Sequence, residues 1–232
     1  LRFNGSSVFG KNNRWGTFPG VSLGWNLHNE EFFANSIGKG NIVNTLKLRG
    51  SYGANGNIGS IGAYTLQGTY GTETYNPNGS LNYRHTYDKN VGYLMTTLPI
   101  ANLKWESLIT KEVGIETRLL NRIDLTVAYY HRTVSDKIAD LRLPQSAGYT
   151  VITTNNGDMQ NQGVEIDVNY QAIRNSDWDL SFNWNTAYNK NKVLKLPSNG
   201  VENNRQGGFQ VYDPKTNDLI WVGGTQEGQD PN

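Results

Sequence analysis

The sequence has no cysteine and no excess charge of either sign, although it is 232 residues long. The lack of cysteine excludes disulfide bonds and thiolate metal ligands, and it leaves the cellular compartment open. Its 21 basic and 20 acidic residues give a net charge of +1, so no general attraction to nucleic acid is expected. The sequence also lacks any run of about 18 consecutive apolar residues, which excludes a transmembrane helix.

Glycine and aromatic residues, by contrast, are abundant: the chain has 26 Gly, 13 Tyr and 6 Trp. Aromatic side chains favour strands and glycine favours turns, so the composition predicts an all-β protein with long loops. The polar composition is still compatible with membrane-spanning strands, because such strands carry polar residues on one face. The chain starts at Leu1 without an initiator methionine and ends at Asn232 in a polar stretch. We therefore expect it to be a segment of a longer protein.

The clearest periodicity lies between Trp105 and Tyr130. Apolar and polar residues alternate in both halves of this stretch, as in Ile115 beside Glu116 and Val127 beside Thr126. A period of two predicts strands, because successive side chains point to opposite faces. We therefore predict a hairpin of two long strands joined by a short turn at 120–122, with the second strand continuing to about residue 138.

The same period predicts further strands at 15–27, 45–52, 163–170 and 180–187, and a small hairpin at 209–211 and 219–222. Pro19 interrupts the first of these stretches. Because proline has no backbone N–H for the ladder, we expect a strand end, a bulge or an edge at that point.

The connections between these strands alternate in length. Long polar loops are predicted at about 53–101, 139–160 and 194–232, and short turns at 120–122 and 174–177. Long loops on one side and short turns on the other are typical of an outer-membrane barrel, whereas a soluble sandwich has no reason to sort its loops. The predicted strands also reach about 9–11 residues, the length that a tilted strand needs to cross a bilayer.

The alternation divides the strands into two faces. The apolar face is predicted to meet lipid and includes Ile115, Val127, Val164 and Ile166. The opposite face is predicted to line a water-filled lumen and carries Arg49, Glu112, Glu116, Glu165 and Asp167. The solvated outer face of a sandwich would hold these charges equally well, so the polar face leaves both architectures open.

Aromatic residues near the ends of the apolar runs are consistent with an interfacial girdle: Trp15, Trp25, Tyr129, Tyr170 and Trp184. A second group of aromatic residues lies in the first long loop. Exposed rings can stack on sugars and peptides, so Tyr64, Tyr70, Tyr75 and Tyr83 are candidates for ligand contact. Packing of the loop against its neighbours explains these tyrosines at least as well.

No residue is predicted to be catalytic or to hold a metal or cofactor. The three histidines are scattered and lack the spacing of metal ligands. Glu112 and Glu116 lie on one strand face and could mimic a glycosidase pair, but alternation alone already places them there. The spacing Gly53-x-x-Gly56-x-x-Gly59 opens no helix and indicates loop geometry rather than dinucleotide binding.

Several motifs together resemble one family, although none would suffice alone. They run in order as Arg14-Trp15-Gly16-x-Phe18-Pro19, Leu46-Lys47-Leu48-Arg49-x-Ser51-Tyr52-Gly53, Asn102-Leu103-Lys104-Trp105-Glu106, Asn161-x-Gly163-Val164-Glu165 and Phe182-Asn183-Trp184-Asn185. In this order they resemble the barrel region of SusC/RagA-type TonB-dependent outer-membrane transporters, over most of residues 1–196.

The resemblance implies a 22-stranded antiparallel transmembrane barrel with an internal plug. Residues 1–232 would be part of this one barrel domain and supply about seven strands, with the plug and N-terminal domains outside the sequence. The family imports glycans or peptides, is energised through TonB, and works with a SusD-like surface lipoprotein.

We therefore expect a segment of a transporter, not an enzyme, that imports oligosaccharides or, as a second choice, peptides across the outer membrane. Two alternatives stay open. One is a passive porin or adhesin-like barrel, and the other is a soluble β-sandwich that binds carbohydrate.

Overall fold

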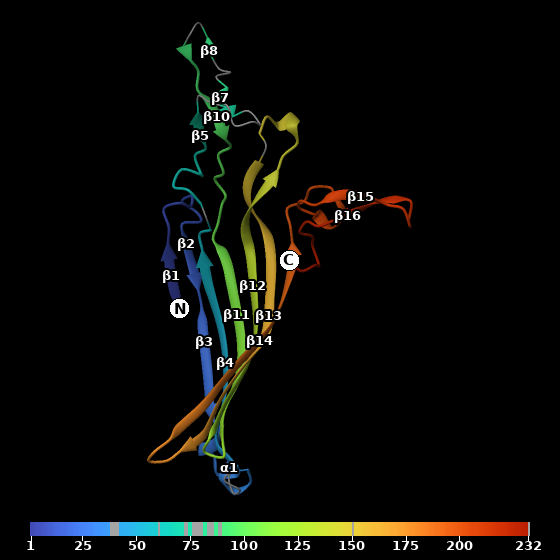
Figure 1. The fold of residues 1–232 in the computed structure, drawn as a ribbon. Helices are drawn as coiled ribbons and strands as arrows, with labels where there is room; N and C mark the ends of the chain where they lie inside the picture. The colour runs from blue at the N-terminus through green and yellow to red at the C-terminus, as the bar shows by residue number, and fades with distance from the viewer. Residues whose placement is uncertain are drawn as a thin grey trace.

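A computed structural model describes residues 1–37, 42–59, 61–71, 74–75, 81–82, 86–87, 90–149 and 151–231 (Figure 1). Its main feature is a six-stranded antiparallel sheet in which each strand pairs with the strands of the same sheet that come before and after it in the sequence. The strands are β3 Gly20–Asn26, β4 Val43–Asn57, β11 Glu106–Leu119, β12 Ile123–Arg142, β13 Val151–Arg174 and β14 Asp179–Lys195. The predicted all-β, antiparallel fold is therefore confirmed.

Five small strand pairs lie outside this sheet within the described ranges. They are β1 Arg2–Gly5 with β2 Trp15–Phe18, β5 Thr69–Gly71 with β10 Leu94–Thr97, β6 Thr74–Tyr75 with β7 Leu81–Asn82, β8 Thr86–Tyr87 with β9 Asn90–Val91, and β15 Phe209–Asp213 with β16 Asp218–Val222. The β15–β16 pair is the small hairpin predicted near the end of the chain. Helical structure is confined to α1 Glu31–Asn35 and three short 3-10 turns within the described ranges, and no helix there could cross a membrane.

Pro19 divides the first predicted strand into two. β2 ends at Phe18 and pairs with β1, whereas β3 begins at Gly20 and pairs with β4. The Pro19 carbonyl still accepts a hydrogen bond of 2.8 Å from the Ala54 N–H. Pro19 therefore keeps its acceptor in the ladder and lacks only the N–H donor. The strand end that proline requires therefore coincides with a change of partner strand.

The strands run further than the predicted loop boundaries. β4 continues through residues 53–57, so Gly53 and Gly56 are strand residues and the loop prediction for them was wrong. Most of the loop predicted at 139–160 belongs to β12 and β13, and only residues 143–150 connect the two strands. Residues 53–57 of β4 and 153–158 of β13 carry no large apolar side chain on either face, so they pair through the backbone without showing a hydrophobic period.

The predicted loop at 53–101 also contains the short strand pairs β5–β10, β6–β7 and β8–β9. The third loop was predicted to begin at about residue 194, but β14 continues to Lys195, so the loop begins two residues later than predicted.

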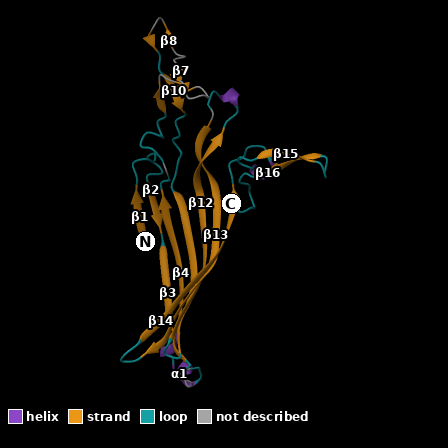
Figure 2. Ribbon diagram, viewed as in Figure 1, coloured by secondary structure: helices purple, strands orange, loops and turns teal. Residues whose placement is uncertain are grey.

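Short and long connections lie at opposite ends of the sheet (Figures 1 and 2). The short-turn end holds the β11–β12 and β13–β14 turns together with α1, and the long-loop end holds β5 to β10 and the β15–β16 hairpin. In the β11–β12 turn, Leu120 and Asn121 have φ values of 53° and 55°, and Arg122 N–H donates to the Leu119 carbonyl over 3.0 Å. Positive φ at both central residues matches the twist of a tight hairpin.

A small aromatic cluster closes the long-loop end of β4 and β11. The Trp105 ring centroid lies 5.2 Å from that of Phe9 and 5.8 Å from that of Phe18. The Phe18 ring covers Gly56, where a Cβ would overlap it. Phe18 breaks the alternation of its strand because it is buried in this cluster.

Candidate functional site

The strand register gathers the predicted charged residues on one face of the sheet. Glu116 is paired with Lys47 and with Thr126, which in turn is opposite Asp167. The next row on the same face joins Arg49, Gly114, Ala128 and Glu165, and the row beyond it contains Ser51, Glu112 and Tyr130. All five residues predicted to line a lumen thus lie in three successive rows of one face of the sheet, and we call this face the charged face.

Arg49 connects two of these rows. Its guanidinium forms an ion pair with Glu112, and its Nε lies 3.1 Å from Glu116 Oε1, without hydrogen-bond geometry at that atom. Gly114 lies between the two glutamates, and a Cβ there would be 2.9 Å from Arg49 Nε. The absence of a side chain at Gly114 therefore lets one arginine reach both carboxylates.

Lys47 and Arg118 complete a set of paired cations on this face. Lys47 Nζ lies 3.0 Å from Glu116 Oε2, and Arg118 Nε lies 2.8 Å from Asp124 Oδ1. Glu165 and Asp167 differ, because neither has an ion pair or a hydrogen bond from its side chain within the described part of the chain. Their carboxylates are available to solvent or to a passing solute.

Tyr130 is a further member of the charged face that the sequence analysis did not single out. Its ring lies over Gly163, its hydroxyl donates to Asn189 Oδ1 over 3.3 Å, and the Arg132 guanidinium lies 4.9 Å from the ring centroid. A Cβ on Gly163 would be 2.7 Å from the Tyr130 hydroxyl and closer still to the Tyr188 carbonyl oxygen. Glycine at a polar-face position of a strand was the signal that could have revealed this packing.

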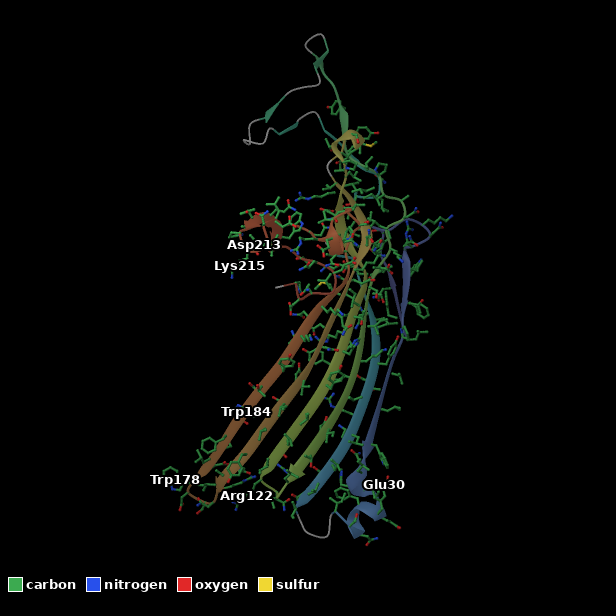
Figure 3. The ribbon with its side chains drawn as sticks, turned by 90° about the vertical axis from the view of Figure 1, so that its right-hand side faces the viewer. Glu30, Arg122, Trp178, Trp184, Asp213 and Lys215 are labelled. Atoms are coloured by element: carbon green, nitrogen blue, oxygen red, sulfur yellow. The ribbon has the colours of Figure 1, made fainter. Side chains whose placement is uncertain are left out.

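The opposite face brings the predicted lipid-facing residues together. Ile115, Val127 and Ile166 are direct cross-strand partners in one row, and Val164 is in the next row opposite Tyr129. This face is open: Ile115 is 45% exposed and Val113 is 58% exposed. Trp184 lies on this face toward the short-turn end, and Figure 3 shows Trp178 and Arg122 at the short turns themselves.

Two hollows lie at the long-loop end of the sheet. One, of about 380 Å³, is lined by Tyr64, Thr69, Leu98 and residues 151–153. The other, of about 530 Å³, is lined by Asn57, Glu106, Lys137 and Asp140, among others, and both hollows share Thr65 and Thr153. Tyr64 is therefore the one candidate among the four loop tyrosines whose described side chain lines a hollow.

The other loop tyrosines are placed differently. Tyr70 is exposed on β5 and is not among the lining residues. Tyr75 belongs to β6, but its side chain lies outside what the structure describes, and Tyr83 lies outside the described residues altogether.

A polar network at the second hollow was also missed. Glu106 is buried, and its carboxylate accepts hydrogen bonds from Asn57 Nδ2 over 2.7 Å and from the Ile138 N–H over 2.8 Å. Asn155 Nδ2 donates to the carbonyls of Lys104 and Asp136 over 2.8 Å each. These bonds tie the start of β11 to β4, β12 and β13, so the rim of the hollow is held by side chains from three strands and by backbone groups of β12.

An antiparallel series of long strands with one open apolar face, one charged face and loops sorted by length defines a segment of a β-barrel wall. The sequence profile described as "TonB dependent receptor-like, beta-barrel" matches residues 1–223. The chain belongs to this family of TonB-dependent receptors.

Individual relatives are consistent with this membership. The chain is 34% identical over 217 residues to TonB-dependent receptor P39 of Formosa agariphila, covering 92% of this chain and 19% of that protein. It is 35% identical over 206 residues to TonB-dependent receptor SusC of Bacteroides thetaiotaomicron, covering 84% of this chain and 19% of SusC. The chain thus spans about a fifth of the length of these relatives.

Among solved structures, the fold is similar to the RagAB peptide importer in two states. The closed-closed state gives a TM-score of 0.69 at 26% identity and covers 96% of this chain and 22% of that chain. The open-open state gives a TM-score of 0.68 at 28% identity, with coverages of 94% and 21%. The resemblance to SusC/RagA-type receptors is therefore confirmed.

Proposed function

We propose that this chain forms part of the barrel wall of an outer-membrane transporter that imports oligosaccharides or peptides with energy supplied through TonB. The observation that carries the proposal is the division of one sheet into an open apolar face and a charged face. An uncovered apolar face of this size needs a non-aqueous partner. Lipid meets that need while the charged face remains in water, as in the wall of a barrel.

The charged face supplies the wall of the transport path. Lys47 and Arg49 together neutralise Glu112 and Glu116, so these four residues line the wall without attracting a charged solute strongly. Glu165 and Asp167 keep free carboxylates, which can accept hydrogen bonds from sugar hydroxyls or peptide N–H groups. Ile115, Val127, Val164 and Ile166 face lipid in this arrangement.

Ligand capture is assigned to the long-loop end, with a SusD-like surface lipoprotein as partner. Two relatives support these choices: one is named SusC, and the RagAB structures are titled a peptide importer. The hollow beside Tyr64 supplies an aromatic ring, threonine hydroxyls and backbone groups, a combination that suits either class of ligand.

The decisive experiment measures uptake by cells that produce the full-length protein, with and without a functional TonB. We expect labelled oligosaccharide or peptide to enter only when TonB is present. Equal uptake without TonB would identify a passive porin instead. A full-length protein that is monodisperse in buffer without detergent would identify a soluble binding module.

A further inference from the structure

The apolar face ends at its long-loop side in a row of basic residues. Following the register outward, the row of Val113, Tyr129 and Val164 is succeeded by a row of Tyr52, Lys111, His131, Gln162 and Lys190. The row after that ends in Lys192. We call Lys111, Lys190 and Lys192 the basic rim.

The basic rim differs from the charged face in having no counter-ions. Lys47, Arg49 and Arg118 on the charged face are each paired with a carboxylate, whereas the three rim lysines have no ion pair or hydrogen bond from their side chains among the described residues. On the apolar face, moreover, the rows from Leu119–Ile123 to Ile109–Thr133 contain no Asp or Glu at any paired position. The rim is therefore a patch of uncompensated positive charge.

The apolar band between the short turns and the rim has the length that a strand needs to cross the hydrocarbon core of a membrane. Along β12, Ile123 follows the β11–β12 turn and His131 lies in the first rim row. The apolar band therefore spans nine residues of this strand, from Ile123 to His131. A tilted strand crosses the hydrocarbon core with about 9–11 residues. With the apolar face in lipid, the rim lysines therefore lie at the depth of the headgroups.

A hollow lies at the edge of the band directly beside the rim. It has a volume of about 580 Å³ and lies over Gly50, which has no side chain to fill it. The remaining residues that line it are Tyr52, Lys111, Val113, Tyr129 and His131, together with Ser51 and Glu112, which belong by register to the charged face. One side of the hollow is thus aromatic and aliphatic, and the other is basic, which is the polarity of a lipid that carries a charged headgroup.

We propose that the basic rim and the hollow over Gly50 bind a lipid with an anionic phosphate headgroup. The phosphate lies against Lys111 at the hollow, Lys190 adds positive charge three strands further along the same row, and an acyl chain lies along Tyr52, Val113 and Tyr129. Charge complementarity favours this occupant, because lysines without counter-ions at headgroup depth attract anionic phosphate. The inference rests on the proposed membrane setting of the apolar face and is independent of the transported substrate.

The test compares lipid binding by the full-length protein in detergent, using native mass spectrometry with added phosphatidylglycerol or phosphatidylcholine. The variant K111Q/K190Q removes two rim charges, and K11Q/K215Q removes two exposed charges elsewhere as a matched control. Each lysine near an anionic surface contributes about fivefold, so the rim variant should bind phosphatidylglycerol about 25-fold more weakly. Phosphatidylcholine binding, and both lipids in the control, should not change.

Unchanged phosphatidylglycerol binding by the rim variant would overturn the lipid site, as would an equal loss in the control variant. A rim variant that keeps its lipid but loses association with a surface lipoprotein or a second copy would instead make the rim a protein interface. Insertion into vesicles is measured in parallel. Normal insertion without lipid selectivity removes this inference alone, whereas failure of the wild-type protein to insert removes the proposed membrane setting as well.

Discussion

The guanidinium of Arg49 lies over Gly114, and from that position it reaches the glutamates two residues before and two residues after the glycine. The arrangement needs three strand features together: a long cation on β4, a gap on β11, and same-face carboxylates on either side of the gap. Together with Lys47, which is paired with Glu116, it turns two like charges on one strand face into a neutral, cross-strand cluster.

Arg49→Met should lower the free energy of unfolding of the full-length protein by about 1–2 kcal/mol, because Glu112 loses its cation in a partly buried position. Arg118→Met is the control, since its pair with Asp124 is about half exposed and should contribute less than about 1 kcal/mol. Urea unfolding in lipid vesicles measures both. Glu112→Gln in the Arg49→Met background should recover part of the loss, and equal losses in the two arginine variants would contradict the shared-cation arrangement.

Gly163→Ala should disrupt the β13–β14 pairing, because its Cβ would overlap the Tyr188 carbonyl and press on the Tyr130 hydroxyl. Overpacking of this kind costs about 1–3 kcal/mol. Gly53→Ala is a matched control, since a Cβ there meets nothing within 4 Å. Melting temperatures of the detergent-solubilised proteins should fall for the first variant only; a loss at Gly53 of the same size would show that any strand alanine is harmful.

Ile115→Lys and Val127→Lys should each destabilise the inserted protein by about 2–4 kcal/mol if their row meets the middle of the bilayer. The two residues are cross-strand partners on the apolar face. Thr126→Lys introduces the same charge one residue away on the charged face, opposite Glu116 and Asp167, and should be tolerated. Folding titrations in vesicles distinguish these outcomes, and equal costs on both faces would contradict the assignment of the apolar face to lipid.

Glu227 fastens the segment after β14 back onto the end of that strand. Its carboxylate accepts hydrogen bonds from the Leu196 N–H over 2.7 Å and from Asn204 Nδ2 over 2.9 Å. The backbone bond from Leu196, with that from Asn204 and the charge of Lys195, holds the pKa of Glu227 below its ordinary value, although desolvation opposes the shift.

Because the folded pKa lies below the unfolded one, the contribution of Glu227 is complete at neutral pH and is lost as the pH falls through the folded pKa, below the ordinary value for glutamate. Glu227→Gln should remove this acid-dependent step. Hydrogen exchange of the Leu196 amide checks it: protection should fall in acid for the wild type, and should be weak and pH-independent in the variant. If the Leu196 amide of the wild type stays protected in acid, the Glu227 carboxylate is not the group that holds this segment.

Tyr64→Ala should weaken binding of the transported ligand by about tenfold, equivalent to about 1.4 kcal/mol, because its ring lines the hollow at the long-loop end. Tyr93→Ala is the control, since Tyr93 is equally exposed but does not line the hollow. Calorimetric titration of the full-length protein with the glycan or peptide identified by the uptake assay measures both affinities. Unchanged affinity for Tyr64→Ala would remove the stacking hypothesis for this loop.

The sequence by itself determined the strands that cross the apolar band and the sorting of their connections. Alternation is a local property, so Ile115 and Glu116 reveal opposite faces without any knowledge of their neighbours. Residues 153–158 of β13 escaped prediction because they carry no large apolar side chain on either face, and backbone pairing alone leaves no pattern in the sequence. Thr153, for instance, is a strand residue opposite Asp140, within what was predicted as a loop.

Only the tertiary structure decided which side chains meet. The register places Arg49 opposite Gly114, Tyr130 opposite Gly163, and Lys111 in one row with Lys190, although these residues are far apart in the chain. A shift of one residue would have sent each to the other face, and nothing in a single strand's alternation sets its alignment with the next. The sequence of each strand therefore determines which residues share a face, whereas the pairing between strands determines which of them form a cluster.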